Sequence, residues 1–147
     1  MQEVLTSPVP QDAELYEQVL QPLPIQIPAG DMCTLEKCGN IFFLTLTGDA
    51  AYEHRLNPTH IASIRTALAE AKSQSTHGTF LITGADGKFF SNGFDLAWAK
   101  SAAGGSLSEA VNLLRHMVDL FKDFVADLIS MRMLTIAAVT GHAQPPD

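Results

Sequence analysis

Apolar and polar positions divide the chain into predicted strands and helices from about residue 33 onward. Ile41–Thr47 (IFFLTLT) is β-branched and aromatic, which is typical of a strand. Asn57 and Pro58 then supply a helix N-cap and a first-turn proline. Four apolar residues follow at helical spacing: Ile61, Ile64, Leu68 and Ala71. The pattern therefore predicts a strand over 41–47 and a helix near 58–73.

The second half of the chain continues this alternation. Thr79–Thr83 is a second apolar strand candidate, and Leu134–Val139 is a third. Between them, Ser106 and Glu109 form a capping box that would open a long helix ending at about Met131. The order of strand, helix, strand, loop, helix and strand predicts an α/β fold with parallel pairing and right-handed crossovers.

Residues 1–31 differ in texture from the rest of the chain. Five of the eight prolines fall there, around one expected helical turn at Asp12–Leu20. We therefore expect a loosely ordered extension over 1–31 that precedes one domain with its own core.

Composition and charge exclude several classes of binding partner. The net charge is −7, and the nine Lys and Arg residues are scattered singly, which argues against a nucleic-acid partner. No run of about 18 apolar residues is present, so we expect neither a membrane span nor a membrane partner. Cys33 and Cys38 have no second Cys/His pair after them, so we expect reduced thiols and no metal. A phosphorylated ligand would need only one or two local cations, such as Arg55, although a solvated surface charge is the commoner role.

The most informative segment is the glycine-rich stretch Thr79–Trp98 (TFLITGADGKFFSNGFDLAW). Gly93 can adopt backbone angles that other residues avoid, which would leave the N–H of Phe94 outside any strand ladder. Asp95 would then cap a helix through Leu96 and Trp98. A free amide beside such a turn is a suitable donor to an oxyanion, although most loops of this kind are simple connections.

Three motifs in order resemble the crotonase superfamily, the enoyl-CoA hydratases and isomerases. The loop matches its signature at Gly84, Gly87-Lys88, Phe90, Ser91, Gly93, Asp95 and Leu96. The segment His54–Pro58 (HRLNP) resembles the family's first strand-to-helix junction, and Leu134–Ala143 (LTIAAVTGHA) resembles its third strand and the start of a second oxyanion segment. The resemblance runs from about Met32 to Ala143 and is strongest to plant peroxisomal delta3-delta2-enoyl-CoA isomerases.

The resemblance implies the N-terminal part of a crotonase-like (ββα)n spiral that is incomplete in this chain, with a partial domain over 32–143 and a divergent tail over 144–147. It also implies an acyl-CoA substrate, no metal or redox cofactor, and a homo- or hetero-trimer with family members. The Phe94 N–H would be the first oxyanion donor, and Arg55 would contact the phosphates or pantetheine. The residues implied to line the substrate site are Ser91, Asn92, Gly93, Phe94, Asp95 and Leu96.

The chain departs from the family after Ala143, where it reads Gln144-Pro145-Pro146-Asp147. Proline has no N–H, so we expect the second oxyanion donor to be missing, together with the glutamate that moves the proton in the isomerases. We therefore expect weak or no isomerisation of unsaturated fatty acyl-CoA in β-oxidation. The alternatives are a non-catalytic fragment that binds acyl-CoA or interferes with trimers, and an enoyl-CoA hydratase. The resemblance implies a peroxisomal location, but the chain lacks a Ser-Lys-Leu type signal, so a truncated chain would be cytoplasmic.

Overall fold

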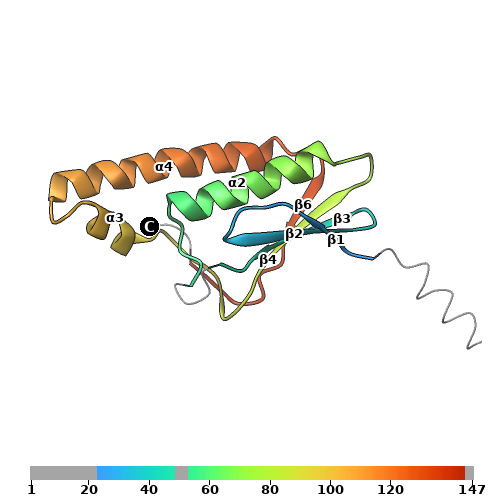
Figure 1. Cartoon of the computed structure of the whole chain (residues 1–147), viewed down its shortest axis with the longest axis horizontal. Helices are drawn as coiled ribbons and strands as arrows, with labels where there is room; N and C mark the ends of the chain where they lie inside the picture. The colour runs from blue at the N-terminus through green and yellow to red at the C-terminus, as the bar shows by residue number, and fades with distance from the viewer. Residues whose placement is uncertain (1–22, 49–52, 145–147) are drawn as a thin grey trace, which may run out of the picture.

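A five-stranded sheet with helices on one face forms the body of the molecule (Figure 1). The computed structural model describes residues 23–48 and 53–144. The strands lie in the order β1-β2-β3-β4-β6. Their bounds are β1 Ile25–Ile27, β2 Cys33–Cys38, β3 Ile41–Leu46, β4 Phe80–Ala85 and β6 Leu134–Ala137. β1, β2 and β3 pair antiparallel, whereas β3, β4 and β6 pair parallel, which confirms the predicted α/β order.

Three helices begin where the sequence places capping residues. α2 (Pro58–Ser73) starts after Asn57, whose side chain accepts the His60 N–H at 2.9 Å. α3 (Leu96–Ala102) starts after Asp95, whose carboxylate accepts the Trp98 N–H at 2.9 Å. α4 (Leu107–Ile129) starts after Ser106, whose hydroxyl accepts the Glu109 N–H at 3.3 Å. Each side chain satisfies a backbone donor that the first helical turn leaves unpaired.

Four short strands were not predicted from the sequence. β1 lies inside the segment expected to be an extension, so the described sheet begins before residue 32. β2 forms a hairpin with β3, and β5 (Phe89–Asn92) pairs in parallel with β7 (His142–Gln144) as a separate two-stranded sheet. The expected turn at Asp12–Leu20 lies outside the described residues. The division into an extension, a partial domain and a tail stays a prediction.

The core lies between the sheet and the helices. Alternate residues of β2, β3 and β4 point to this side, and α2 and α4 supply the opposing apolar side chains. The fully buried members of the core include Leu35, Phe42, Leu44, Ile61, Leu68, Leu81 and Met117. Each such side chain contributes roughly 1.5–3 kcal/mol by leaving water, which makes this layer the main source of stability.

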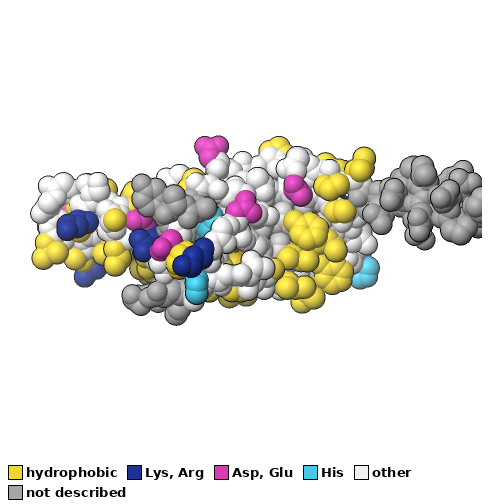
Figure 2. Space-filling view, turned by 90° about the horizontal axis from the view of Figure 1, so that it is seen from below, with side chains coloured by type: hydrophobic (Ala, Val, Ile, Leu, Met, Phe, Trp, Pro, Cys, Tyr) yellow, Lys and Arg dark blue, Asp and Glu magenta, His cyan; other side chains and the backbone are white. Residues whose placement is uncertain are grey.

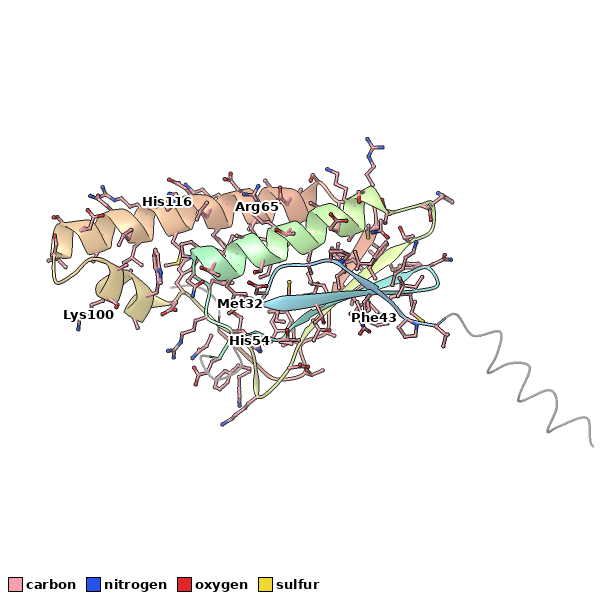
Figure 3. All side chains as sticks on the ribbon, viewed as in Figure 1. Met32, Phe43, His54, Arg65, Lys100 and His116 are labelled. Carbon is pink, nitrogen blue, oxygen red and sulfur yellow. The ribbon has the colours of Figure 1, made fainter. Side chains whose placement is uncertain are left out.

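α2 and α4 are also joined by charge. The Arg65 guanidinium donates to the Asp127 carboxylate at 2.6 Å and lies 4.0 Å from Asp123 (Figure 3). The hydrogen bond to Asp127 raises the pKa of Arg65. Lys122 pairs with Asp119 at 3.6 Å on the exposed side of the same helix. The row of aspartates on α4 therefore serves helix contacts and the solvated surface.

The opposite face of the sheet carries apolar side chains without a helix above them. The register aligns Phe43, Ile82 and Ile136 across three strands, and it aligns Ile41, Phe80 and Leu134 one step away. We call these six residues the outer apolar face. Leu134 is 60% exposed and Ile136 45% exposed, and Figure 2 shows a group of apolar side chains on the side away from the helices. Apolar sheet faces are normally covered, so this surface is suited to contact with another polypeptide.

The buried thiol of Cys33 gives the core a defined alkaline sensitivity. Cys33 is 4% exposed on β2, and its thiol donates to the Ser63 carbonyl at 3.5 Å. Burial raises its pKa from 9.0 to about 11. Cys38, at the other end of the same strand, is only half-buried.

We expect the free energy of unfolding to fall as the pH rises from 9 toward 11. In that range the unfolded chain releases the Cys33 proton while the native state retains it, so the unfolded state gains stability on the order of 2 kcal/mol. Urea unfolding at several pH values should show this slope in the wild type and a flatter one in Cys33→Ala. Cys38→Ala is the control and should keep the wild-type slope; equal slopes in all three proteins would contradict the assignment.

Candidate functional site

Two segments far apart in the sequence lie side by side at one end of the sheet. The Leu56 N–H donates to the Gly93 carbonyl, and the Asp95 N–H donates to the Leu56 carbonyl, each at 2.8 Å. These bonds form an isolated parallel bridge between Leu56 and Phe94. In such a bridge the residue between the two bonded groups directs its own N–H and carbonyl away from its partner. The Phe94 N–H therefore points away from Leu56.

The Phe94 amide is held firmly but is not used within the described structure. Gly93 has φ +74°, an angle at which a side chain would be strained. The ring of Phe94 packs edge-to-face on Phe121 of α4, with the ring centroids 5.4 Å apart. Among the described residues no acceptor takes the Phe94 N–H. The amide is thus fixed in direction and lies outside any strand ladder, and its role as an oxyanion donor stays a prediction.

The turn before Leu56 forms hydrogen bonds to the glycine-rich loop. Glu53 and His54 both have left-handed backbone angles, with φ +63° and +50°. The Ser91 hydroxyl donates to the His54 carbonyl at 3.2 Å, and the Asn92 side-chain amide donates to the Glu53 carboxylate. His54 is fully buried, and its Nε2 lies 2.7 Å from the Asp86 carbonyl oxygen. Figure 3 shows His54 among the connecting segments on the side of the sheet away from the helices.

An apolar pocket of about 380 Å³ lies next to this bridge. The glycine-rich loop contributes Phe90 and Ser91 to its wall, and the segment before α2 contributes Leu56. The sheet and α4 supply most of the remaining wall. The other lining residues are Leu44, Leu46, Ile64, Leu68, Thr83, Phe121, Phe124, Leu128, Thr135, Ile136 and Ala137. Its size and lining are typical of a site for a small apolar group.

A second, open pocket of about 450 Å³ lies beside α3. Arg55 and Asp95 line it together with Trp98 and small residues of the helix. Arg55 is 39% exposed and forms an ion pair with Glu53 at 2.9 Å. The pocket thus offers one cation at its wall, and that cation already has a carboxylate beside it.

The structure brings most of the predicted site residues into this small region. Ser91 lines the apolar pocket, Asn92 and Gly93 belong to the braced segment, and Asp95 caps α3. Leu96 is the exception, because its side chain is 57% exposed and lines neither pocket. The roles of these residues in binding stay predictions.

The segment expected to begin a second oxyanion donor lies against the same loop. β7 pairs with β5, and the His142 N–H donates to the Lys88 carbonyl at 3.0 Å. A Cβ at Gly141 would lie 2.2 Å from that carbonyl oxygen, so only glycine permits the approach. The side chain of His142 is exposed, with its ring 5.3 Å from that of Phe89.

Sequence reasoning missed the turn that braces the loop. In the sequence, His54 stands only as the first residue of the His54–Pro58 motif, and no pattern indicates a role for Glu53. A left-handed pair of residues without glycine leaves little local signal in a sequence, because non-glycine residues seldom adopt positive φ, even though His does so more often than most. Their contacts to Asp86, Ser91 and Asn92 depend on the folded chain.

The described residues contain no group of three or more His, Cys, Asp or Glu side chains placed to hold a metal ion. Within the same part of the chain, no helix is both long and apolar enough to cross a membrane.

Comparison with solved structures identifies the fold. The chain superposes on an enoyl-CoA hydratase/isomerase from Mycobacterium paratuberculosis with a TM-score of 0.60 and 15% sequence identity, over 78% of this chain and 43% of that one. The mixed α/β arrangement is that of the crotonase fold. This chain has part of that fold.

Sequence relatives of the matched region are named enoyl-CoA delta isomerases, and this chain is similar to them over part of their length. It is 60% identical over 112 residues to enoyl-CoA delta isomerase 2, peroxisomal, from Arabidopsis thaliana, covering 76% of this chain and 45% of the relative. It is 55% identical over 112 residues to enoyl-CoA delta isomerase 3 of the same plant, covering 76% of this chain and 44% of the relative. The chain therefore spans less than half the length of these curated relatives. No protein-family model matches it.

Proposed function

We propose that this chain carries the first half of an acyl-CoA site, of the kind used by an enoyl-CoA delta isomerase. The observation that carries the proposal is the fixed, unused N–H of Phe94 beside an apolar pocket. A thioester carbonyl oxygen is a suitable acceptor for such an amide. Homology to two enoyl-CoA delta isomerases over the same residues supports this choice of ligand.

In this proposal the apolar pocket and the open pocket beside α3 bind different parts of the acyl-CoA. The apolar pocket takes the acyl chain, because its walls are almost entirely hydrocarbon. The open pocket beside α3 takes part of the CoA, with Arg55 turned from Glu53 toward a phosphate or the pantetheine. Exchange of one anionic partner for another would cost the arginine little electrostatic energy at a half-exposed position.

The Phe94 amide would act on charge that develops during the reaction. Removal of a proton near the thioester carbonyl places negative charge on its oxygen, forming an enolate. A backbone donor that is already oriented stabilises that charge without reorganising, and one such donor is typically worth roughly 100-fold or more in rate. In an isomerase the same proton returns two carbons away, which moves a 3-enoyl double bond to position 2.

Acid–base chemistry requires a further group. None of the residues that line the apolar pocket is a carboxylate, an imidazole or an amine. Asp95, the nearest predicted site residue with a carboxylate, is occupied by the Trp98 N–H and the Asn57 side chain. We therefore propose that the 147-residue polypeptide binds acyl-CoA but isomerises it slowly.

The name of one relative supports a proposal for the cellular setting. One matched isomerase is named as peroxisomal, and the reaction proposed here prepares unsaturated fatty acyl chains for β-oxidation. We propose the same process and compartment for this chain, with hydration of a 2-enoyl-CoA as the alternative chemistry on the same oxyanion donor.

We expect Gly93→Ala to weaken binding of hexanoyl-CoA at least about tenfold. A Cβ at φ +74° forces the Gly93–Phe94 peptide to turn, which redirects the donor N–H. Quenching of Trp98, the single tryptophan, provides the titration signal because it lines the pocket beside α3.

Gly78→Ala is the matched control for this titration. Gly78 has φ +81°, so alanine there carries a similar backbone cost, but it lies in the turn after α2 and away from the loop. Both variants should lose roughly 1–2 kcal/mol of stability, and only Gly93→Ala should lose affinity. Equal affinities in the two variants would rule out the Phe94 amide as the ligand donor.

We expect 3-hexenoyl-CoA to be converted to the 2-enoyl isomer at least about 100-fold more slowly by this polypeptide than by a purified full-length relative. The reason is that one oriented donor is available without an adjacent base. The increase in conjugated-enoyl absorbance measures isomerisation, and its loss from 2-hexenoyl-CoA measures hydration. Turnover within tenfold of the relative would overturn this expectation, and faster hydration than isomerisation would favour the hydratase.

The outer apolar face favours a second function, association with a family member. Its two central rows cross β3, β4 and β6 without a helix above them. A polypeptide that covers this face would bury apolar area equivalent to several core side chains. We propose that the chain can join an enoyl-CoA isomerase assembly as a non-catalytic partner.

We expect the chain to form complexes with a purified full-length isomerase that light scattering after size-exclusion chromatography detects. Leu134→Lys places a charge on the outer apolar face, where the side chain is 60% exposed and lines neither pocket, and should abolish the complex. Leu107→Lys adds the same charge at the start of α4, where the side chain is 81% exposed, and should leave it intact. A chain that stays monomeric in the mixture would refute the association.

A further inference from the structure

We propose that His54 is the positioning residue that fixes the glycine-rich loop, and with it the direction of the Phe94 N–H. The inference rests on the proposed function only where it treats that amide as the ligand donor. The remainder concerns how one buried side chain determines the shape of a loop that lies more than thirty residues further along the chain.

His54 contacts the loop at both ends. Its Nε2 lies 2.7 Å from the carbonyl oxygen of Asp86, where the loop leaves β4. Its own carbonyl accepts the hydroxyl of Ser91, which lies in β5 just before Gly93. The turn at Gly87 and the two phenylalanines after it are thus held between two bonds to a single residue. Movement of either end would break one of them.

The imidazole contact also defines the tautomer. A backbone carbonyl can only accept, so the proton must be on Nε2, and the Nδ1 of the neutral ring carries a lone pair. Nδ1 is buried and has no hydrogen-bond partner among the described residues. Leaving a buried polar atom unpaired costs roughly 1–3 kcal/mol. A side chain that only filled space would not need a polar atom there, so the donor at Nε2 is the functional part of the ring.

The backbone at Glu53 and His54 is also strained. Glu53 and His54 are consecutive left-handed residues, each of which costs roughly 1–2 kcal/mol. The conformation turns the His54 carbonyl toward Ser91 and brings the Glu53 carboxylate to the Asn92 side chain. Strain of this kind persists where the surrounding contacts maintain it, and it is concentrated at functional sites.

The turn at Glu53 and His54 is also connected to α2. The Arg55 carbonyl lies 3.0 Å from Nδ1 of His60 in the first turn of α2, and Leu56 follows at the bridge to Phe94. A continuous set of contacts therefore runs from α2 through His54 to both ends of the loop. Its last member is the peptide that presents the Phe94 N–H.

The test compares two substitutions of similar size. His54→Gln retains an N–H donor at about the reach of Nε2, and His54→Leu fills the space without a donor. Both are non-glycine residues, so the backbone cost is the same.

We expect the exchange of the Leu56 and Asp95 amide protons, which form the bridge, to accelerate at least tenfold in His54→Leu. The Ile61 amide of α2 is the internal control and should not change. In the same variant, hexanoyl-CoA affinity should fall at least tenfold while the unfolding midpoint stays near that of the wild type. His54→Gln should restore both measurements to within about threefold. Unchanged exchange in His54→Leu would show that the ring only fills space.

Two further outcomes separate this inference from the proposed function. If the wild type does not bind hexanoyl-CoA, the proposed function fails, and exchange alone decides the role of His54. If either variant fails to fold, the nitrogen chemical shifts of His54 in the wild type decide it. A protonated Nε2 with an unprotonated Nδ1 supports the proposal, and the opposite tautomer overturns it.

Discussion

The pair of 2.8 Å hydrogen bonds between Leu56 and the Gly93–Asp95 backbone joins the two segments from which the site is built. One segment leads into α2 and the other leads into α3, so the bridge also sets where both helices begin. Asn57 strengthens the junction, because it caps α2 and its side chain donates to Asp95, the cap of α3. Loss of the bridge would therefore disturb the loop and two helix starts together.

The one-sided helix layer gives the molecule two different apolar surfaces. The face under α2 and α4 is closed and forms the core, whereas the outer apolar face is open to contact. All four residues of β6 are exposed although its sequence is that of a buried strand, because this strand borders the apolar pocket on one side and carries the outer apolar face on the other. This chain spans less than half of its relatives' length, and the proposed association would place another polypeptide on the outer apolar face.

The sequence predicted the elements whose signals are local. Asn57-Pro58, Ser106 and Asp95 identified three helix starts because a cap needs only a short side chain at the right position. The strand at Ile41 was evident from its β-branched and aromatic residues. β2 was missed because CTLEKC alternates weakly, and its pairing with β3 depends on a hairpin turn at Gly39. β5 and β7 pair across most of the chain, which no local pattern reveals.

The sequence predicted which backbone amide forms the candidate site, but it did not predict the side chains that hold this amide in place. Gly93 and Phe94 could be identified because a glycine in a turn after a strand is suited to positive φ, which the structure shows at +74°. The resemblance of three ordered motifs then gave that amide a ligand class. The residues that hold it in place are different, since Glu53 and His54 act through contacts that exist only after folding.

The chemistry proposed for this site uses the main chain, so it would restrict the sequence mainly at residues that set the backbone. A backbone N–H does not depend on the side chain that follows it, so the phenyl ring of Phe94 serves as an anchor against Phe121. The restriction instead falls on residues that determine backbone direction or spacing. Gly93 permits the turn, and Gly141 permits β7 to approach the Lys88 carbonyl. Substitution of either glycine would alter the donor's direction or its surroundings while leaving every polar side chain of the loop in the sequence.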